Sequence, residues 1–289
     1  MSTRATLIGF SAILMWSLLS LLTVATGTVP PFQLAAMTFA IAGAMGVATW
    51  AFRLGAAAAL RQPARVWALG VGGLFGYHAL FFLALRLAPA AEAQLVNYLW
   101  PVLIVLLSAF LPGERLKLHH FAGAMIALTG TVLLFLGRGG LVFAQDYLPG
   151  FAAAFVAAFT WAIYSVMSRR YATAPTDIVA GFCLATALLA AIFHTLFEQT
   201  QWPQTIGQWL AVAGLGIGPV GAAFYVWDIG MKHGDIRILG VASYLAPLLS
   251  TAFLVLAGYA QPSLWLGLAA ILIAAGGVLA AKDMIRRKA

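Results

Sequence analysis

Charged residues are scarce in this chain. Asp, Glu, Lys and Arg make up 8% of its 289 residues and hydrophobic residues make up 63%, whereas roughly 25% of the residues of a soluble domain are charged. Apolar runs of about twenty residues recur from end to end and leave no room for a separate soluble domain. We therefore predict an all-α integral membrane protein.

Cysteine is nearly absent, and basic residues form no cluster. The single cysteine, Cys183, cannot form an internal disulfide. The formal net charge is +8, but the lysines and arginines are spread between the apolar runs. We therefore expect no nucleic-acid partner, because nucleic-acid binding needs a basic patch.

Patterns for catalysis and metal binding are also missing. The chain has no HExxH motif, no nucleophile with a base at motif spacing and no paired intramembrane carboxylates. His119 and His120 are adjacent, so on a helix they project about 100° apart, and no carboxylate or thiol accompanies them. We expect a protein that is not an enzyme and that uses no metal and no cofactor.

Ten apolar runs are each long enough to cross about 30 Å of hydrocarbon as a helix. The joints between them are short and contain glycine and proline, as at 27–31. The predicted spans are 5–25, 32–52, 66–87, 90–111, 121–136, 148–167, 178–197, 209–230, 236–258 and 264–281.

Lysines and arginines are distributed unequally between the two sides of such a bundle. If the N-terminus is cytoplasmic, the opposite side carries 2, Arg86 and Arg138, and the cytoplasmic side carries 14. Cytoplasmic loops are enriched in these residues, so we predict that both termini are cytoplasmic. The 14 are Arg4, Arg53, Arg61, Arg65, Arg115, Lys117, Arg169, Arg170, Lys232, Arg237, Lys282, Arg286, Arg287 and Lys288.

The fourth and ninth spans carry the same proline motif. NYLWP at 97–101 matches SYLAP at 243–247, which pairs Tyr98 with Tyr244 and Pro101 with Pro247 at an offset of 146 residues. Proline has no N–H to donate and crowds the carbonyl four residues before it. We therefore predict a helix break in both spans, with Pro101 and Pro247 as hinges.

The same offset relates TGTV at 129–132 to AGGV at 275–278. It divides the chain into two units of five spans, 1–140 and 146–289, and because five is odd the second unit enters the membrane from the opposite side. Inverted repeats with broken helices are typical of secondary transporters that bind substrate near the bilayer midplane. We predict ten transmembrane helices in two inverted five-helix repeats around a central cavity. Chance similarity between apolar helices is the alternative.

Four stretches resemble the drug/metabolite transporter superfamily, specifically its ten-helix EamA branch. They are ATLIGFSAILMWS (5–17), EAQLVNYLWPVL (92–103), AFTWAIYSVMSRRYA (158–172) and GMKHGDIRILGVASYLAP (230–247). NYLWP is similar to the motif of aromatic amino-acid exporters in this branch. The resemblance implies a bacterial inner-membrane exporter of aromatic and other large neutral amino acids, built as two basket-like halves around a central cavity.

Aromatic residues recur at mid-span positions, where they can form the wall of such a cavity. Residues three or four apart share a helix face, and contacts between rings suit a phenyl or indole substrate. The predicted substrate-binding residues are Tyr77, His78, Phe81, Asn97, Tyr98, Trp100, Trp161, Tyr164, Ser165, Trp227 and Tyr244. Helix packing is the alternative for these rings, and a role in gate packing is open for Trp16, which matches Trp161 by the repeat.

Ionisable residues within the membrane are costly and are candidates for proton coupling. Asp228, His78 and Glu92 are such residues. The alternatives are an ion pair between Asp228 and Lys232 on one helix face, a packed ring for His78, and a helix-capping role for Glu92. The carbonyls of Asn97 and Ser243, freed by the prolines, could accept from a substrate ammonium.

We predict a secondary transporter that exports aromatic and other large neutral amino acids by alternating access through an aromatic-lined cavity. Its partners would be a small-molecule substrate and the lipid bilayer, and it would act as a monomer. The main alternative is a broad exporter of amphipathic metabolites or organic cations, because aromatic faces attract cations. A channel is a further alternative, and the sequence leaves proton coupling open.

Overall fold

The computed structural model describes residues 2–53, 55–112, 116–137, 141–258 and 261–282. Within these ranges the regular structure is helical and contains no strand. Nine helical segments are long and apolar enough to cross a membrane, and α15 (Leu264–Ala280) is a shorter apolar helix of 17 residues. The predicted all-α membrane class is confirmed. Of the charges used to predict orientation, Arg115, Arg138, Arg286, Arg287 and Lys288 lie outside the described residues.

Each predicted span corresponds to one helix or to an interrupted pair of helices. The first five are α1 (Thr3–Trp16) with α2 (Leu19–Ala25), α3 (Pro31–Trp50), α4 (Ala64–Val71) with η2 (Gly72–Gly76) and α5 (Tyr77–Leu87), α6 (Ala90–Asn97) with α7 (Trp100–Ser108), and α8 (Leu118–Leu136). The second five are α9 (Leu148–Ser168), α10 (Ile178–Phe197), α11 (Ile206–Ile217) with η5 (Gly218–Ala222) and α12 (Ala223–His233), α13 (Ile236–Ala242) with α14 (Leu245–Leu256), and α15. Short 3₁₀ turns are η1 (Ala56–Leu60), η3 (Gln145–Tyr147) and η4 (Arg169–Tyr171).

The interruptions repeat at the offset that the sequence motifs have. The two π-helices, η2 and η5, begin 146 residues apart, and so do the helix pairs α5 and α12, α6 and α13, and α8 and α15. π-Helical turns inside α-helices are rare and occur frequently at functional sites. The third and eighth spans each contain a π-helix at the matching position, so they are structurally equivalent parts of the two halves.

The breaks in the fourth and ninth spans have a common cause. Pro101 and Pro247 cannot donate to the carbonyls four residues before them, so the helical hydrogen-bond pattern stops there. α6 ends at Asn97 and α13 at Ala242. Both prolines are buried within the protein, so the broken segments are covered by neighbouring helices, as the hydrocarbon environment requires.

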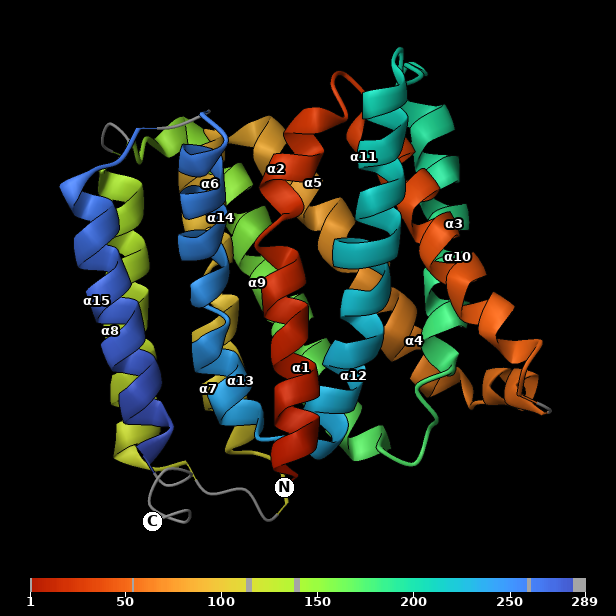
Figure 1. The fold of residues 1–289 in the computed structure, drawn as a ribbon, viewed down its shortest axis with the longest axis horizontal. Coiled ribbons are helices and arrows are strands. Elements are labelled where there is room, and N and C mark those ends of the chain that lie inside the picture. The colour runs from red at the N-terminus through yellow and green to blue at the C-terminus, as the bar shows by residue number, and fades with distance from the viewer. Residues whose placement is uncertain (1, 54, 113–115, 138–140, 259–260, 283–289) are drawn as a thin grey trace.

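The two halves form one bundle with matching helix contacts (Figure 1). α8 and α15 pack together at one edge of the bundle, and α3 and α10 pack together at the other. α1 packs against α12, and its counterpart α9 packs against α5. The start of α1 and the end of α15 lie at the same end of the bundle (Figure 1), which we call the terminal end; the other end is the opposite end.

Small residues allow the closest helix contacts. A Cβ atom placed on Gly123 of α8 would lie 2.6 Å from the carbonyl oxygen of Gly276 in α15. A Cβ atom on Gly9 of α1 would lie 2.8 Å from the Cα atom of Gly230 in α12. Close backbone contact through small residues is the usual way in which membrane helices associate, and it fixes α1 and α12 beside the centre of the bundle.

Candidate functional site

A cavity of about 100 Å³ lies between the two halves. The lining residues come from the first, third, fourth, sixth, eighth and ninth spans and are Trp16, Leu19, Tyr77, His78, Gln94, Asn97, Tyr98, Trp100, Trp161, Pro219, Val220, Phe224 and Ala246. Both repeats therefore contribute to one site.

Three tryptophans form one side of this cavity, and a fourth packs behind them. Trp16 lies edge-on to Trp161 at 5.7 Å between ring centroids, and Trp100 lies edge-on to Trp161 at 6.3 Å. Trp227 lies behind them, 4.9 Å from Trp16 and only 1% exposed. Its Nε1 donates to the Ser165 hydroxyl at 3.1 Å. The edge and tilted arrangements are those that aromatic rings favour, so the cluster forms a firm apolar wall.

Polar groups lie on another part of the wall. The Asn97 amide nitrogen donates to the Tyr77 hydroxyl at 3.0 Å. Asn97 is 1% exposed, and its side-chain oxygen has no hydrogen-bond partner within the described part of the chain. His78 forms a 2.7 Å hydrogen bond through Nδ1 with the Leu74 carbonyl, which fixes its ring. The cavity thus joins an indole-lined side to a neutral polar side.

The π-helix η5 helps to form the wall. Pro219 lies within it, and its carbonyl accepts a 3.0 Å hydrogen bond from Trp16 Nε1. Backbone groups freed by a π-turn need other partners. Here a carbonyl in the second repeat holds a cavity tryptophan of the first repeat.

Some residues that the sequence singled out lie behind the cavity wall rather than on it. Phe81 stacks on Tyr77 at 6.0 Å, Tyr164 packs where Gly73 leaves room for its ring, and Tyr244 is fully buried. Ser165 and Trp227 form the pair described above. The structure brings the other six predicted residues to the cavity, namely Tyr77, His78, Asn97, Tyr98, Trp100 and Trp161.

Sequence reasoning did not assign Gln94, Phe224 or Trp16 to the cavity, yet all three line it. Gln94 precedes Asn97 by three residues and so shares its helix face, a signal that could have identified it. Phe224 precedes Trp227 by the same interval. Trp16 stands at the end of α1, where the first span is interrupted without a proline or glycine, and no local signal predicts this.

The other candidate ionisable groups have protein partners. Asp228 pairs with Lys232 at 2.8 Å and accepts from the Thr176 hydroxyl at 2.7 Å, with both charged side chains almost fully buried. The Glu92 carboxylate lies in the first turn of α6 and accepts from the Val142 backbone N–H at 2.5 Å. Neither residue lines the cavity.

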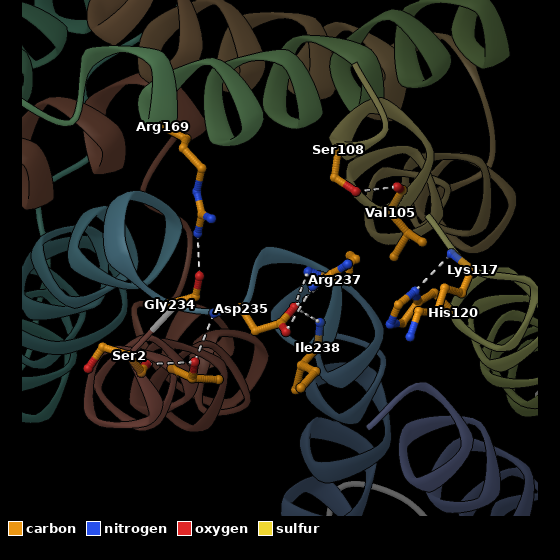
Figure 2. A network of polar contacts seen from close by, with 11 residues as sticks. Ser2, Val105, Ser108, Lys117, His120, Arg169, Gly234, Asp235, Arg237 and Ile238 are labelled. Atoms are coloured by element: carbon orange, nitrogen blue, oxygen red, sulfur yellow. Dashed lines mark hydrogen bonds and ion pairs between the residues drawn. The ribbon is translucent and has the colours of Figure 1, made fainter. Parts of the chain in front are cut away.

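A polar network joins the helices at the terminal end (Figure 2). The Thr6 hydroxyl of α1 accepts from the Asp235 backbone N–H at 2.8 Å. Arg169, at the end of α9, donates to the Met231 carbonyl at 2.9 Å and also to the Gly234 carbonyl. Asp235 caps α13 by accepting from the Arg237 backbone N–H at 3.1 Å. These contacts connect α1, α9, α12 and α13 between the cavity and the terminal end.

Comparisons with known proteins identify clear relatives. Residues 3–136 and 148–281 match the EamA-like transporter family. A protein of Ancylobacter novellus named aromatic amino acid exporter YddG is 60% identical over 280 residues, covering 96% of this chain and 97% of that protein. A protein of Salmonella typhimurium with the same name is 30% identical over 299 residues, covering 96% and 97%. A solved crystal structure with 59% identity covers 96% of this chain and 98% of its own, with a TM-score of 0.92.

Proposed function

The chain belongs to the EamA-like transporter family, and we propose from this membership that it exports aromatic and other large neutral amino acids through the central cavity. The relatives named aromatic amino acid exporter support this substrate class. Membership of a transporter family also favours a protein that is not an enzyme. We place it in a bacterial inner membrane, as a monomer with both termini cytoplasmic.

The unpartnered side-chain oxygen of Asn97 is the observation that carries the substrate assignment. A buried acceptor without a partner is costly, and a substrate ammonium would satisfy it. The Tyr77 hydroxyl accepts from the Asn97 amide, which leaves its own hydrogen to donate to the substrate carboxylate. The aromatic side chain would then lie against Trp100 and Trp161, where ring contacts add about 0.5–1.5 kcal/mol per pair.

Transport would alternate between this arrangement and one in which the terminal end opens. Most of the lining residues lie close to the helix breaks. Leu19, in α2 beyond the first break toward the opposite end, is 40% exposed, and the polar network holds the terminal end together. The repeats 1–140 and 146–289 would exchange these two conformations, with Pro101 and Pro247 as hinges. Inverted repeats transport by such movements of one half against the other.

Uptake of labelled tryptophan into proteoliposomes tests the function, with Trp161→Ala as the variant. Loss of two ring contacts would raise the half-saturation concentration about tenfold, and unlabelled phenylalanine would compete with the wild type. Trp202→Ala removes an exposed tryptophan, 57% exposed outside the spans, and should leave transport unchanged. Equal behaviour of the two variants would contradict the cavity assignment.

The same vesicles separate the alternatives. Competition by an aromatic organic cation but not by phenylalanine would favour a broad-specificity exporter. An imposed pH gradient that changes the initial rate would indicate proton coupling. His78 is then the first residue to substitute, because it lines the cavity, whereas Asp228 and Glu92 are bound to other protein groups.

A further inference from the structure

A second hollow lies on the outside of the bundle, among α3, α5 and α10. It has a volume of about 360 Å³ and is lined by apolar side chains, including Phe32, Ala79, Leu83, Phe193 and Phe197. Leu83 is 45% exposed and Phe197 is 56% exposed. The hollow therefore opens toward the hydrocarbon of the membrane. We call it the lateral groove.

The lateral groove spans the depth of about one leaflet. Gly76 lines its inner part and Arg86 its outer part. They are ten residues apart along the third span, which corresponds to about 15 Å at 1.5 Å per residue. This is half of the roughly 30 Å thickness of the hydrocarbon core. An acyl chain that enters beside Arg86 would reach the bilayer midplane within the groove.

Arg86 gives the groove a charged end. It lies in the last turn of α5 and is exposed, and it makes no hydrogen bond or ion pair with any described residue. Two carboxylates at the same end of the bundle have other partners: Glu92 binds the Val142 N–H, and Glu198 binds the N–H groups of Phe32 and Gln33. The guanidinium is thus available to an external anion.

The lateral groove is separated from the central cavity by aromatic rings. Phe32 lies edge-on to Phe82 at 5.2 Å, and Phe82 lies edge-on to His78 at 5.9 Å. His78 lines the cavity. An occupant of the groove would therefore support the rear of the cavity wall without entering it.

We propose that the lateral groove binds an anionic phospholipid, with one acyl chain along the apolar wall and the phosphate on Arg86. A guanidinium binds phosphate oxygens through two parallel hydrogen bonds. A cationic residue near the membrane surface attracts anionic lipids. The apolar wall holds the chain, and Arg86 selects the headgroup.

Native mass spectrometry of the full-length protein tests the proposal. The protein would be taken from bilayers containing equal amounts of phosphatidylglycerol and phosphatidylcholine. Wild type should retain phosphatidylglycerol in preference to phosphatidylcholine. Arg86→Gln should lower this preference about fivefold, the equivalent of roughly 1 kcal/mol per cation at the surface, and Arg86→Lys should keep most of it.

Two further variants make the result specific. Arg61→Gln removes an exposed arginine from the terminal end of the bundle and should not change lipid retention. Ala79→Phe fills the lateral groove and should reduce retention of both lipids. The proposal fails if Arg86→Gln retains phosphatidylglycerol as the wild type does, or if Arg61→Gln has the same effect. The Arg86 and Arg61 variants decide the question alone if Ala79→Phe does not fold, and none of these readouts depends on transport.

Discussion

The first and sixth spans occupy equivalent places in the two repeats but differ in shape. The sixth is one continuous helix, α9, of 21 residues. The first is interrupted at 17–18, between α1 and α2 (Figure 1). Trp161 in α9 and Trp16 at the end of α1 both line the cavity. The two spans therefore present similar tryptophans to the site, yet only one continues straight beyond it.

The two spans also differ in what they pack against beyond these tryptophans. Beyond Trp161, α9 continues toward the terminal end, packs against α12 and places Arg169 on the carbonyls of Met231 and Gly234. Beyond Trp16, α2 packs instead on α11 and α14, and Leu19 lines the cavity. In the inverted arrangement the two spans would exchange these roles, as inverted repeats do in transporters.

The largest expected effect is a loss of stability when the buried ion pair between Asp228 and Lys232 is broken. Asp228→Leu would leave the Lys232 ammonium buried without its carboxylate, and such losses cost about 3–5 kcal/mol. We expect a large fall in the thermal unfolding temperature of the purified protein. The double variant Asp228→Leu with Lys232→Met should recover most of the stability, because it leaves no unpaired charge. A double variant as unstable as the single one would contradict this account.

A smaller effect, on the opening of the terminal end, is expected where α9 meets α12. Arg169→Met removes two charge-assisted hydrogen bonds, to the Met231 and Gly234 carbonyls, at the terminal end. Each is worth about 1.5–3 kcal/mol, so a net shift of about 2 kcal/mol would raise the population of the state open at that end roughly thirtyfold. The rate of thiol labelling at Ser168→Cys, in a Cys183→Ala background, measures this opening.

Arg170 provides the matched control for that measurement. It is the exposed neighbour of Arg169, and no hydrogen bond joins it to another described residue. Arg170→Met should leave the labelling rate at residue 168 unchanged. If both variants increase labelling equally, loss of positive charge rather than of the two hydrogen bonds is responsible, and the closure assigned to Arg169 is wrong.

The spans and their repeat could be predicted from the sequence because both depend on local properties. Apolar length defines a transmembrane helix, and Pro101 and Pro247 define two of the breaks. The break after α1 has no such signal. There Ser17 donates its hydroxyl to the Leu14 carbonyl at 2.5 Å, a bond that serine can form in any helix. Whether the helix breaks at this serine depends on how α2 packs against α11 and α14, which are far away in the sequence.

Symmetry in the sequence also predicted more symmetry in the site than the structure has. Tyr98 and Tyr244 occupy equivalent positions in the two motifs, but only Tyr98 lines the cavity. Tyr244 is fully buried in a cluster with Val102 and Val105. The two tyrosines differ because the helices around the two motifs pack differently. Matching positions in the two motifs cannot indicate which of two equivalent residues lines the cavity.

The smallest expected effect is a difference in stability between substitutions of Trp16 and Trp161. Trp16→Phe keeps an aromatic ring but removes the 3.0 Å hydrogen bond to the Pro219 carbonyl, which should lower stability by about 1 kcal/mol. Trp161→Phe removes an indole that makes no hydrogen bond among the described residues, so it should cost less. Thermal unfolding of both variants measures the difference. If Trp161→Phe proves the more destabilising, the hydrogen bond to η5 does not hold α1 at the cavity, and ring packing alone fixes the first span.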